Sequence, residues 1–381
     1  MSPRIYLDYC ATTPVHSSVR EKMSRALEVD FGNPSSMHWA GKDSLHLITQ
    51  ARLDVAAGIG CRPNELIFTG GATEADNLAL FGTMHLFSPN KAHLITSSIE
   101  HHAILHAAAL LEHEGYSVTY LPVNEHGLVE PEDVRRAICP ETKLISIMYV
   151  NNEVGSIQPI AEIGRIAREH NIRFHTDAVQ AVGSYDVNVD DLNLDLLSLS
   201  AHKIYGPKGI GALYVRSGLE LIPMIVGGPQ EHSLRAGTEN VPGIVGLGAA
   251  MNLVSQHRAD ERARLPRLRK YLIDGLQSVE PTMIVNGLEE KTASHILSIS
   301  FIGVDAEMML IRLNSEGFAV SLGSACNSKS IEPSHVLTAM KLSQERIEST
   351  LRISLGMPTS QDELGLFLNA VAQVLPRVRV V

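Results

Sequence analysis

The chain has 381 residues, of which 44% are hydrophobic and 19% charged, and its formal net charge is −10 at pH 7. This length suggests two or three domains, and the acidic balance argues against binding to nucleic acid. No apolar run approaches the roughly 18 residues of a membrane helix, and the N-terminus lacks a signal-peptide pattern. The four cysteines are widely spaced, which is typical of reduced thiols. We therefore expect a cytoplasmic, enzyme-sized protein that does not contact a membrane.

Short apolar segments alternate with amphipathic segments from about residue 65 to residue 216. The expected strands are Glu65–Thr69, His93–Ser97, Ser117–Val123, Lys143–Val150, Ile172–Ala178, Leu194–Ser200 and Gly211–Arg216. The expected helices between them are Thr73–Phe87, His101–Gly115 and Ile160–His170. This order predicts an α/β fold in which helices cover both faces of a mostly parallel sheet.

The spacing of the elements becomes wider after about residue 260. The elements expected there are the strands Ser294–Phe301 and Leu351–Leu355 and the helix Asp305–Glu316. Ser360 and Glu363 have the spacing of a capping box, which predicts the start of a terminal helix. We expect a large domain over residues 12–260 and a smaller α+β domain formed by residues 1–11 and 261–381.

A glycine-rich turn follows the first predicted strand and begins the first predicted helix. It reads TGGATEADN over residues 69–77. The two glycines permit a tight turn, and the N–H groups of a helix start, with the Thr73 hydroxyl, can hold a phosphate. Many such turns bind nothing, so this segment alone leaves a phosphate site and an ordinary turn equally open.

A lysine and an aspartate lie at the ends of two successive predicted strands. Lys203 precedes a turn rich in Gly and Pro, and Asp177 ends the strand before it. A lone loop lysine is usually solvated, but a partly desolvated lysine can form a Schiff base. The pair favours the second interpretation. Pyridoxal phosphate requires a lysine that holds its aldehyde as an imine and an acid that keeps its ring nitrogen protonated.

Motifs along nearly the whole chain resemble those of the cysteine desulfurases of iron–sulfur assembly, in the class V aminotransferase group. The motifs are YLDYCATTP at 6–14, GNPSS at 32–36, the turn at 70–77, VNNEVG at 150–155, the Asp177 and Lys203 segments, RAGTEN at 235–240 and GSAC at 323–326. The resemblance implies the fold of the type I pyridoxal-phosphate transferases. It also implies pyridoxal 5′-phosphate as the cofactor.

The resemblance further implies a role for each matching residue. Lys203 would hold the cofactor aldehyde, Asp177 would pair with the ring nitrogen, and His101 would stack on the ring as a catalytic residue. The other implied cofactor contacts are Asn152 and Gln180 at the ring, and Ala72, Thr73, Ser200, His202 and, from a second subunit, Thr238 at the phosphate. Arg352, with Asn152 beside it, would bind the substrate carboxylate through a planar guanidinium.

The implied reaction converts L-cysteine to L-alanine and transfers the sulfur, as a persulfide on Cys326, to an acceptor protein. An isolated cysteine is usually buried and inert, but small residues surround Cys326 and describe an accessible loop. Two alternatives remain open. A selenocysteine lyase or a small-amino-acid transaminase would not need Cys326, and a non-catalytic scaffold would need none of these groups. The implied assembly is a homodimer.

Some features depart from the family pattern or suggest other chemistry. Leu322 and Asn327 stand where the family usually has Ser and Thr, and Pro229 replaces the third glycine of a Gly run. These changes bear on loop mobility, acceptor docking and rate. Several histidines are close in sequence, but they lack zinc-ligand spacing, so no metal site is expected. They are His93, His101, His102, His106 and His113.

Overall fold

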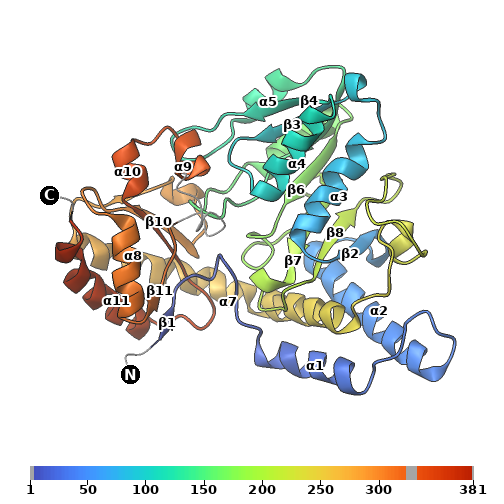
Figure 1. Ribbon diagram of the computed structural model, residues 1–381, viewed down its shortest axis with the longest axis horizontal. Helices are drawn as coiled ribbons and strands as arrows, with labels where there is room; N and C mark the ends of the chain where they lie inside the picture. Colours follow the sequence, from blue (N-terminus) through green and yellow to red (C-terminus); the bar gives the residue numbers. More distant parts are fainter. Residues whose placement is uncertain (1–3, 323–332, 380–381) are drawn as a thin grey trace.

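A seven-stranded sheet forms the centre of the computed structural model, which describes residues 4–322 and 333–379 (Figure 1). The strand order is β2-β8-β7-β6-β5-β3-β4. The bounds are β2 (Leu66–Thr69), β3 (His93–Ser97), β4 (Ser117–Leu121), β5 (Thr142–Ser146), β6 (Arg173–Asp177), β7 (Leu196–Ser200) and β8 (Gly211–Val215). Only β8 runs antiparallel to its neighbours within this described sheet. The predicted α/β fold with a mostly parallel sheet is confirmed.

Helices cover both faces of this sheet. The helices on one face are α3 (Ala72–Met84) and α4 (His102–His113), and those on the other are α2 (Trp39–Ile59), α6 (Ile160–Glu169) and α7 (Val241–Val279). Successive residues of a strand point to opposite faces. Accordingly, Leu144 and Leu196 pack with the first group, whereas Ile145 and Leu197 pack with the second. The strands are therefore apolar at almost every position, as buried parallel strands are.

One predicted strand ends early for a physical reason that bears on the site. The segment Lys143–Val150 was expected to be extended throughout, but β5 ends at Ser146. The Met148 N–H donates to the buried carboxyl group of Glu100, with N–O distances of 3.0 Å, instead of to β3. On the other side the N–H groups of Ile147 and Tyr149 still donate to the His175 and Asp177 carbonyl oxygens of β6. The chain therefore separates from β3 but stays beside β6 as it reaches the cavity described below.

The smaller part of the molecule contains a three-stranded sheet, a two-stranded sheet and its own core. Its elements are β1 (Ile5–Tyr6), β9 (Ile284–Val285), β10 (Ile296–Ser300), α8 (Ala306–Ser315), β11 (Phe318–Ala319), α9 (His335–Ala339), α10 (Gln344–Glu348), β12 (Thr350–Ser354) and α11 (Gln361–Val374). β10 lies between β12 and β9, antiparallel to both, and β1 pairs with β11 in parallel. The capping box is confirmed, because the Glu363 N–H donates to Ser360 Oγ and the Ser360 N–H donates to the Glu363 carboxylate.

Helix α7 connects the two parts and was not predicted. It has 39 residues, and Figure 1 shows it in yellow, running from beneath the large sheet into the smaller part. Its first half packs in the core of the large sheet, and its second half, which includes Leu268 and Leu272, packs in the other core. The polar run SQHRADERAR at 255–264 and Pro266 interrupt its apolar pattern. The expected division at residue 260 falls inside this helix and stays a prediction.

Two further helices pack on the outer layer of the large part. Helix α1 (Ser17–Glu28) lies against α7, and the short α5 (Pro131–Ala137) lies beside α6. Neither α1 nor α2 was predicted. Within the described ranges, no helix combines the length and the apolar character needed to cross a membrane.

Replacing Gly211 by Ala should destabilise the fold at the glycine-rich turn. A Cβ atom at this position would lie 2.6 Å from the Leu199 carbonyl oxygen and 2.7 Å from the Gly71 carbonyl carbon. Both obstacles are backbone, so we expect a loss of about 1–3 kcal/mol in the free energy of unfolding, measured by urea denaturation. Gly365→Ala is the control, because the nearest atom there is Tyr271 Oη at 3.4 Å. Equal stability of the two variants would contradict the close approach.

Candidate active site

A cavity of about 980 Å³ lies at the carboxyl ends of the strands β6 and β7. Ligands bind at this edge in open α/β sheets. Segments far apart in the sequence line it, including the start of α3, the residues after β5 and the Cys10–Thr12 segment. The predicted site residues that line it are Ala72, Thr73, His101, Asn152, Asp177, Gln180, Ser200, His202, Lys203 and Arg352. The fold thus brings these residues together, although their individual roles stay predictions.

One predicted site residue within the described ranges is not part of this lining. Thr238 is exposed in the segment between β8 and α7. The predicted sulfur acceptor, Cys326, lies outside the described residues.

Lys203 is held at the cavity by the N-terminal segment. Its Nζ donates to the carbonyl oxygens of Cys10 and of Ala11, the latter at 2.9 Å. The Gln180 amide donates to the same Cys10 oxygen at 3.0 Å. Thr13 fixes the next turn, since its hydroxyl donates to the His202 carbonyl and accepts from the Tyr205 N–H. These bonds position the lysine amine relative to the ends of β6 and β7.

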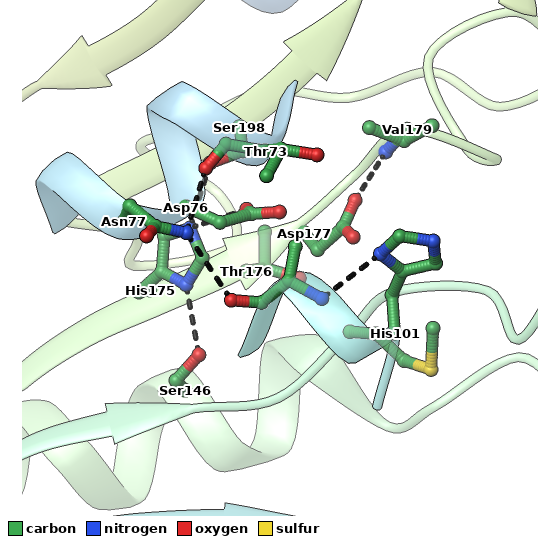
Figure 2. A network of polar contacts seen from close by, with 12 residues as sticks. Thr73, Asp76, Asn77, His101, Ser146, His175, Thr176, Asp177, Val179 and Ser198 are labelled. Carbon is green, nitrogen blue, oxygen red and sulfur yellow. Dashed lines mark hydrogen bonds and ion pairs between the residues drawn. The ribbon is translucent and has the colours of Figure 1, made fainter. Parts of the chain in front are cut away.

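Asp177 ends β6 and is buried, with 7% of its surface exposed. Its Oδ1 accepts the Val179 N–H at 2.9 Å (Figure 2). Burial raises the pKa of Asp177 to about 6, while the Val179 N–H and the Lys203 ammonium act in the opposite direction. Asp177 is therefore a carboxylate at neutral pH, as a partner for a protonated ring nitrogen must be.

His101 is the N-cap of α4, and its ring faces the cavity. Its Nδ1 accepts the Ala103 N–H at 3.2 Å (Figure 2). Burial, and then the nearby Lys203 ammonium, lower the pKa of His101 to about 4. The imidazole is therefore neutral at neutral pH. Because Nδ1 accepts, the ring proton is on Nε2.

Arg352 is a fully buried cation on β12, with 1% of its surface exposed. Its Nη2 donates to Asp8 Oδ1 and its Nη1 donates to the Asn152 carbonyl oxygen, both at 2.8 Å. The Asn152 turn is held by Asn151, whose Oδ1 accepts the N–H groups of Glu153 and Val154. The guanidinium therefore connects the smaller part to the N-terminal segment and to the cavity wall.

Three residues that shape the site were not singled out from the sequence. Asp8 holds Arg352, Asn151 holds the turn, and Glu100 binds the Met148 N–H. Burial raises the pKa of Glu100 to about 8. The first two belong to motifs that the sequence displays, but their partners are distant in the chain and become evident only in the folded structure.

The lining residues fit pyridoxal phosphate. Helix α3 begins directly after Gly71, and no side chain forms a capping hydrogen bond at its N-terminus. Its first N–H groups can therefore bind an anion. Thr73, Ser200 and His202 line the cavity with this helix start. A carboxylate (Asp177) and an amine (Lys203) complete the donor set that the phosphate, the ring nitrogen and the aldehyde require.

Three histidines near the cavity pack ring against ring. The rings of His102 and His106 lie 4.9 Å apart, and those of His102 and His335 lie 4.8 Å apart, between ring centroids. In the part of the chain that the structure describes, no group of three or more His, Cys, Asp or Glu residues could hold a metal ion.

The fold and the cavity define a class of pyridoxal-phosphate enzymes, and comparison with known proteins agrees. The family model for aminotransferase class-V matches residues 5–367. The "Cysteine desulfurase IscS" of Dictyoglomus turgidum is 45% identical over 381 residues, which cover 100% of this chain and 97% of that protein. The chain therefore belongs to the class-V aminotransferases and, among them, to the cysteine desulfurase family. Its predicted family and pyridoxal-phosphate cofactor are confirmed.

Solved structures give the same result. A NifS-like protein superimposes with a TM-score of 0.93 and 35% identity, covering 99% of this chain and 100% of that one. A structure described as SspA in complex with cysteine has a TM-score of 0.82 and 42% identity, covering 92% of this chain and 98% of the other.

The Asp177 charge should appear in the pH dependence of pyridoxal-phosphate binding by the apoprotein. Burial raises the pKa of Asp177 to about 6, so the carboxylate is present above this pH and is lost as the pH falls through it. We expect the affinity for pyridoxal phosphate, measured by titration of the apoprotein, to fall over the same range. Asp177→Asn should lack this pH dependence, still retain the cofactor at neutral pH, and lose roughly 10- to 100-fold in the rate of sulfide release from cysteine. Near-normal turnover in the variant would place the ring-nitrogen partner elsewhere.

Proposed function

We propose that this protein is a pyridoxal-phosphate-dependent cysteine desulfurase that converts L-cysteine to L-alanine and passes the sulfur to an acceptor. One observation carries the proposal: Lys203, Asp177, His101 and Arg352 come from four separate segments and line one cavity. A scaffold protein would have no use for this set. Membership of the cysteine desulfurase family supports the choice of substrate.

Arg352 is the proposed binding group for the substrate carboxylate. A planar guanidinium can bind both oxygens of a carboxylate. Its buried position and its bonds to Asp8 and to the Asn152 carbonyl fix its direction before a substrate arrives. Asn152 itself lines the cavity and is the second proposed contact.

Lys203 is the proposed proton carrier. Its amine, held near the Cys10 and Ala11 carbonyls, would accept the Cα proton of the bound amino acid. Pyridoxal phosphate, when bound, supplies the electron sink for the charge that this leaves. Asp177 would keep the ring nitrogen protonated. His101 is neutral at the pH of reaction, and its Nε2–H faces the site as a donor.

Cys326 is the proposed sulfur acceptor. Its thiolate would attack the substrate sulfur, the bond from that sulfur to Cβ would break, and Cβ would gain a proton to give alanine. The extra sulfur would stay on Cys326 as a persulfide until a thiolate of an acceptor protein removes it. The GSAC motif at 323–326 supports this role.

A homodimer is the proposed assembly, with Thr238 of one subunit completing the phosphate site of the other. Exposed apolar side chains support it, because such groups mark interaction surfaces. They are Leu27, Val29, Phe31, Met37 and Trp39 near α1 and α2, and Met224, Ile225 and Val226 after β8. Arg52 of α2 binds Glu231 at 2.5 Å, which ties the second segment to the first.

The proposed location is the cytoplasm, and iron–sulfur assembly is the proposed use of the sulfur. Among the described cysteines, Cys10, Cys61 and Cys139 are free thiols, which is typical of a reducing compartment. The iron–sulfur use rests on the family resemblance.

Mass spectrometry of the protein after treatment with cysteine tests the sulfur acceptor. Cys326→Ser should keep the absorption of the bound cofactor and form no persulfide, because a hydroxyl is not a nucleophile toward sulfur. Lys203→Ala should lose both the covalently bound cofactor and turnover. Cys61→Ser is the matched control and should behave as the wild type. Extra sulfur found mainly on Cys61 or Cys139 would overturn the assignment, and sulfide release without Cys326 would favour a lyase.

A mixed dimer tests the shared site. Thr238→Ala and Lys203→Ala subunits, each defective alone, would be co-expressed and the heterodimer isolated. If Thr238 acts across the interface, both changes fall in one site and the other site is native, so about half of the wild-type activity should return. If it acts within its own chain, each site carries one change and activity stays low. Low activity would contradict the proposal.

A further inference from the structure

Asp76 is a buried acid of the cavity to which the resemblance assigns no role. It follows Thr73 by one helical turn of α3, so both side chains lie on the same face of the helix and line the cavity. Only 1% of its surface is exposed. Figure 2 shows Asp76, from α3, and Asp177, from β6, in the same part of the site. Neither carboxyl oxygen of Asp76 has a hydrogen-bond partner among the described residues.

The base nearest to Asp76 is committed to other partners. His175 Nε2 lies 3.7 Å from Asp76 Oδ1, beyond hydrogen-bond distance. The same Nε2 is 3.0 Å from Ser198 Oγ, and Nδ1 is 2.9 Å from Ser146 Oγ. These three residues form a row across β7, β6 and β5 beneath α3 (Figure 2). Burial lowers the pKa of His175 to about 3, so its ring is neutral and provides no counter-charge.

The two aspartates have opposite surroundings. Asp177 accepts the Val179 N–H and lies near the Lys203 ammonium, whereas Asp76 has no N–H donor among the described residues. The other groups that act on Asp76 are the Ser198 hydroxyl, on β7, and Glu100, before α4. Burial, followed by the Asp177 charge, raises the pKa of Asp76 well above its usual range, while the Ser198 hydroxyl acts in the opposite direction. Two buried carboxyls that repel each other do not both ionise readily. Asp177 has the N–H donor and the nearby cation, so it takes the charge and Asp76 keeps the proton.

We propose that Asp76 is a cofactor-binding residue, a neutral carboxylic acid that donates a hydrogen bond to the pyridoxal phosphate held beside the Asp177 carboxylate. A buried donor without an acceptor is costly, and this one faces a cavity that a ligand fills. The inference rests on the cofactor site described above and adds a donor to it.

Titration of the apoprotein with pyridoxal phosphate tests this donor. At neutral pH, Asp76→Asn, which keeps an N–H donor, should stay within about threefold of the wild-type affinity, whereas Asp76→Leu should lose about tenfold or more. Thr83→Val is the matched control, because Thr83 is a buried residue of α3 that is not part of the cavity lining. At alkaline pH the wild type should lose affinity relative to Asp76→Asn, since an ionised Asp76 cannot donate. Equal affinities of the Asn and Leu variants would overturn the proposal.

The charge state can be measured without any ligand. Apoprotein carrying ¹³C at its aspartate carboxyl carbons should show a protonated carboxyl signal at neutral pH that is missing from Asp76→Asn. A signal for Asp76 that is ionised at neutral pH would overturn the proposal even if Asp76→Leu failed to fold. Neither measurement uses cysteine. A protein that binds pyridoxal phosphate in the expected order but releases no sulfide would therefore refute the proposed function and support the role of Asp76.

Discussion

The parallel pairing of β6 with β7 is the constraint on which the whole site depends. In this register Asp177 lies opposite Ser198, so both strands end at the same edge of the sheet. The acid at the end of one strand and the lysine just after the other consequently reach the same cavity. The remaining lining segments are placed by their bonds to this edge. The Cys10 and Ala11 carbonyls bind Lys203, and the chain after β5 separates from β3, but not from β6, where Glu100 binds the Met148 N–H.

Burial decides which acids and bases around the cavity are charged. Burial removes the hydration that a charged imidazole needs, and at His101 the nearby Lys203 ammonium adds to this effect, so His101 and His175 both stay neutral at neutral pH. Asp177 ionises because a backbone N–H and a cation stabilise its charge. Arg352 remains charged and forms an ion pair with the Asp8 carboxylate. Two of the charged groups that line the cavity, Asp177 and Arg352, are each held in a fixed direction by hydrogen bonds.

Local patterns predicted the sheet and the Asp177 and Lys203 positions, and the resemblance to a known family predicted most of the remaining cavity lining. The predicted strands were apolar runs with clear ends, and residues such as Asp177 and Lys203 occupied recognisable motifs. Helix α7 was missed because its polar middle faces neither core, so its periodicity is broken. The partners of Arg352 and the surroundings of Asp76 could not be predicted. They depend on contacts between segments that only the tertiary fold brings together.

The long helix α7 has a consequence for how the molecule unfolds. At 1.5 Å per residue its 39 residues extend for about 58 Å, and its two halves belong to different hydrophobic cores. If either core melted, half of the helix would lose its packing, and helical segments without packing are marginal in water. The melting of one part therefore weakens the other. The two parts are thermodynamically linked and should unfold in a single cooperative transition.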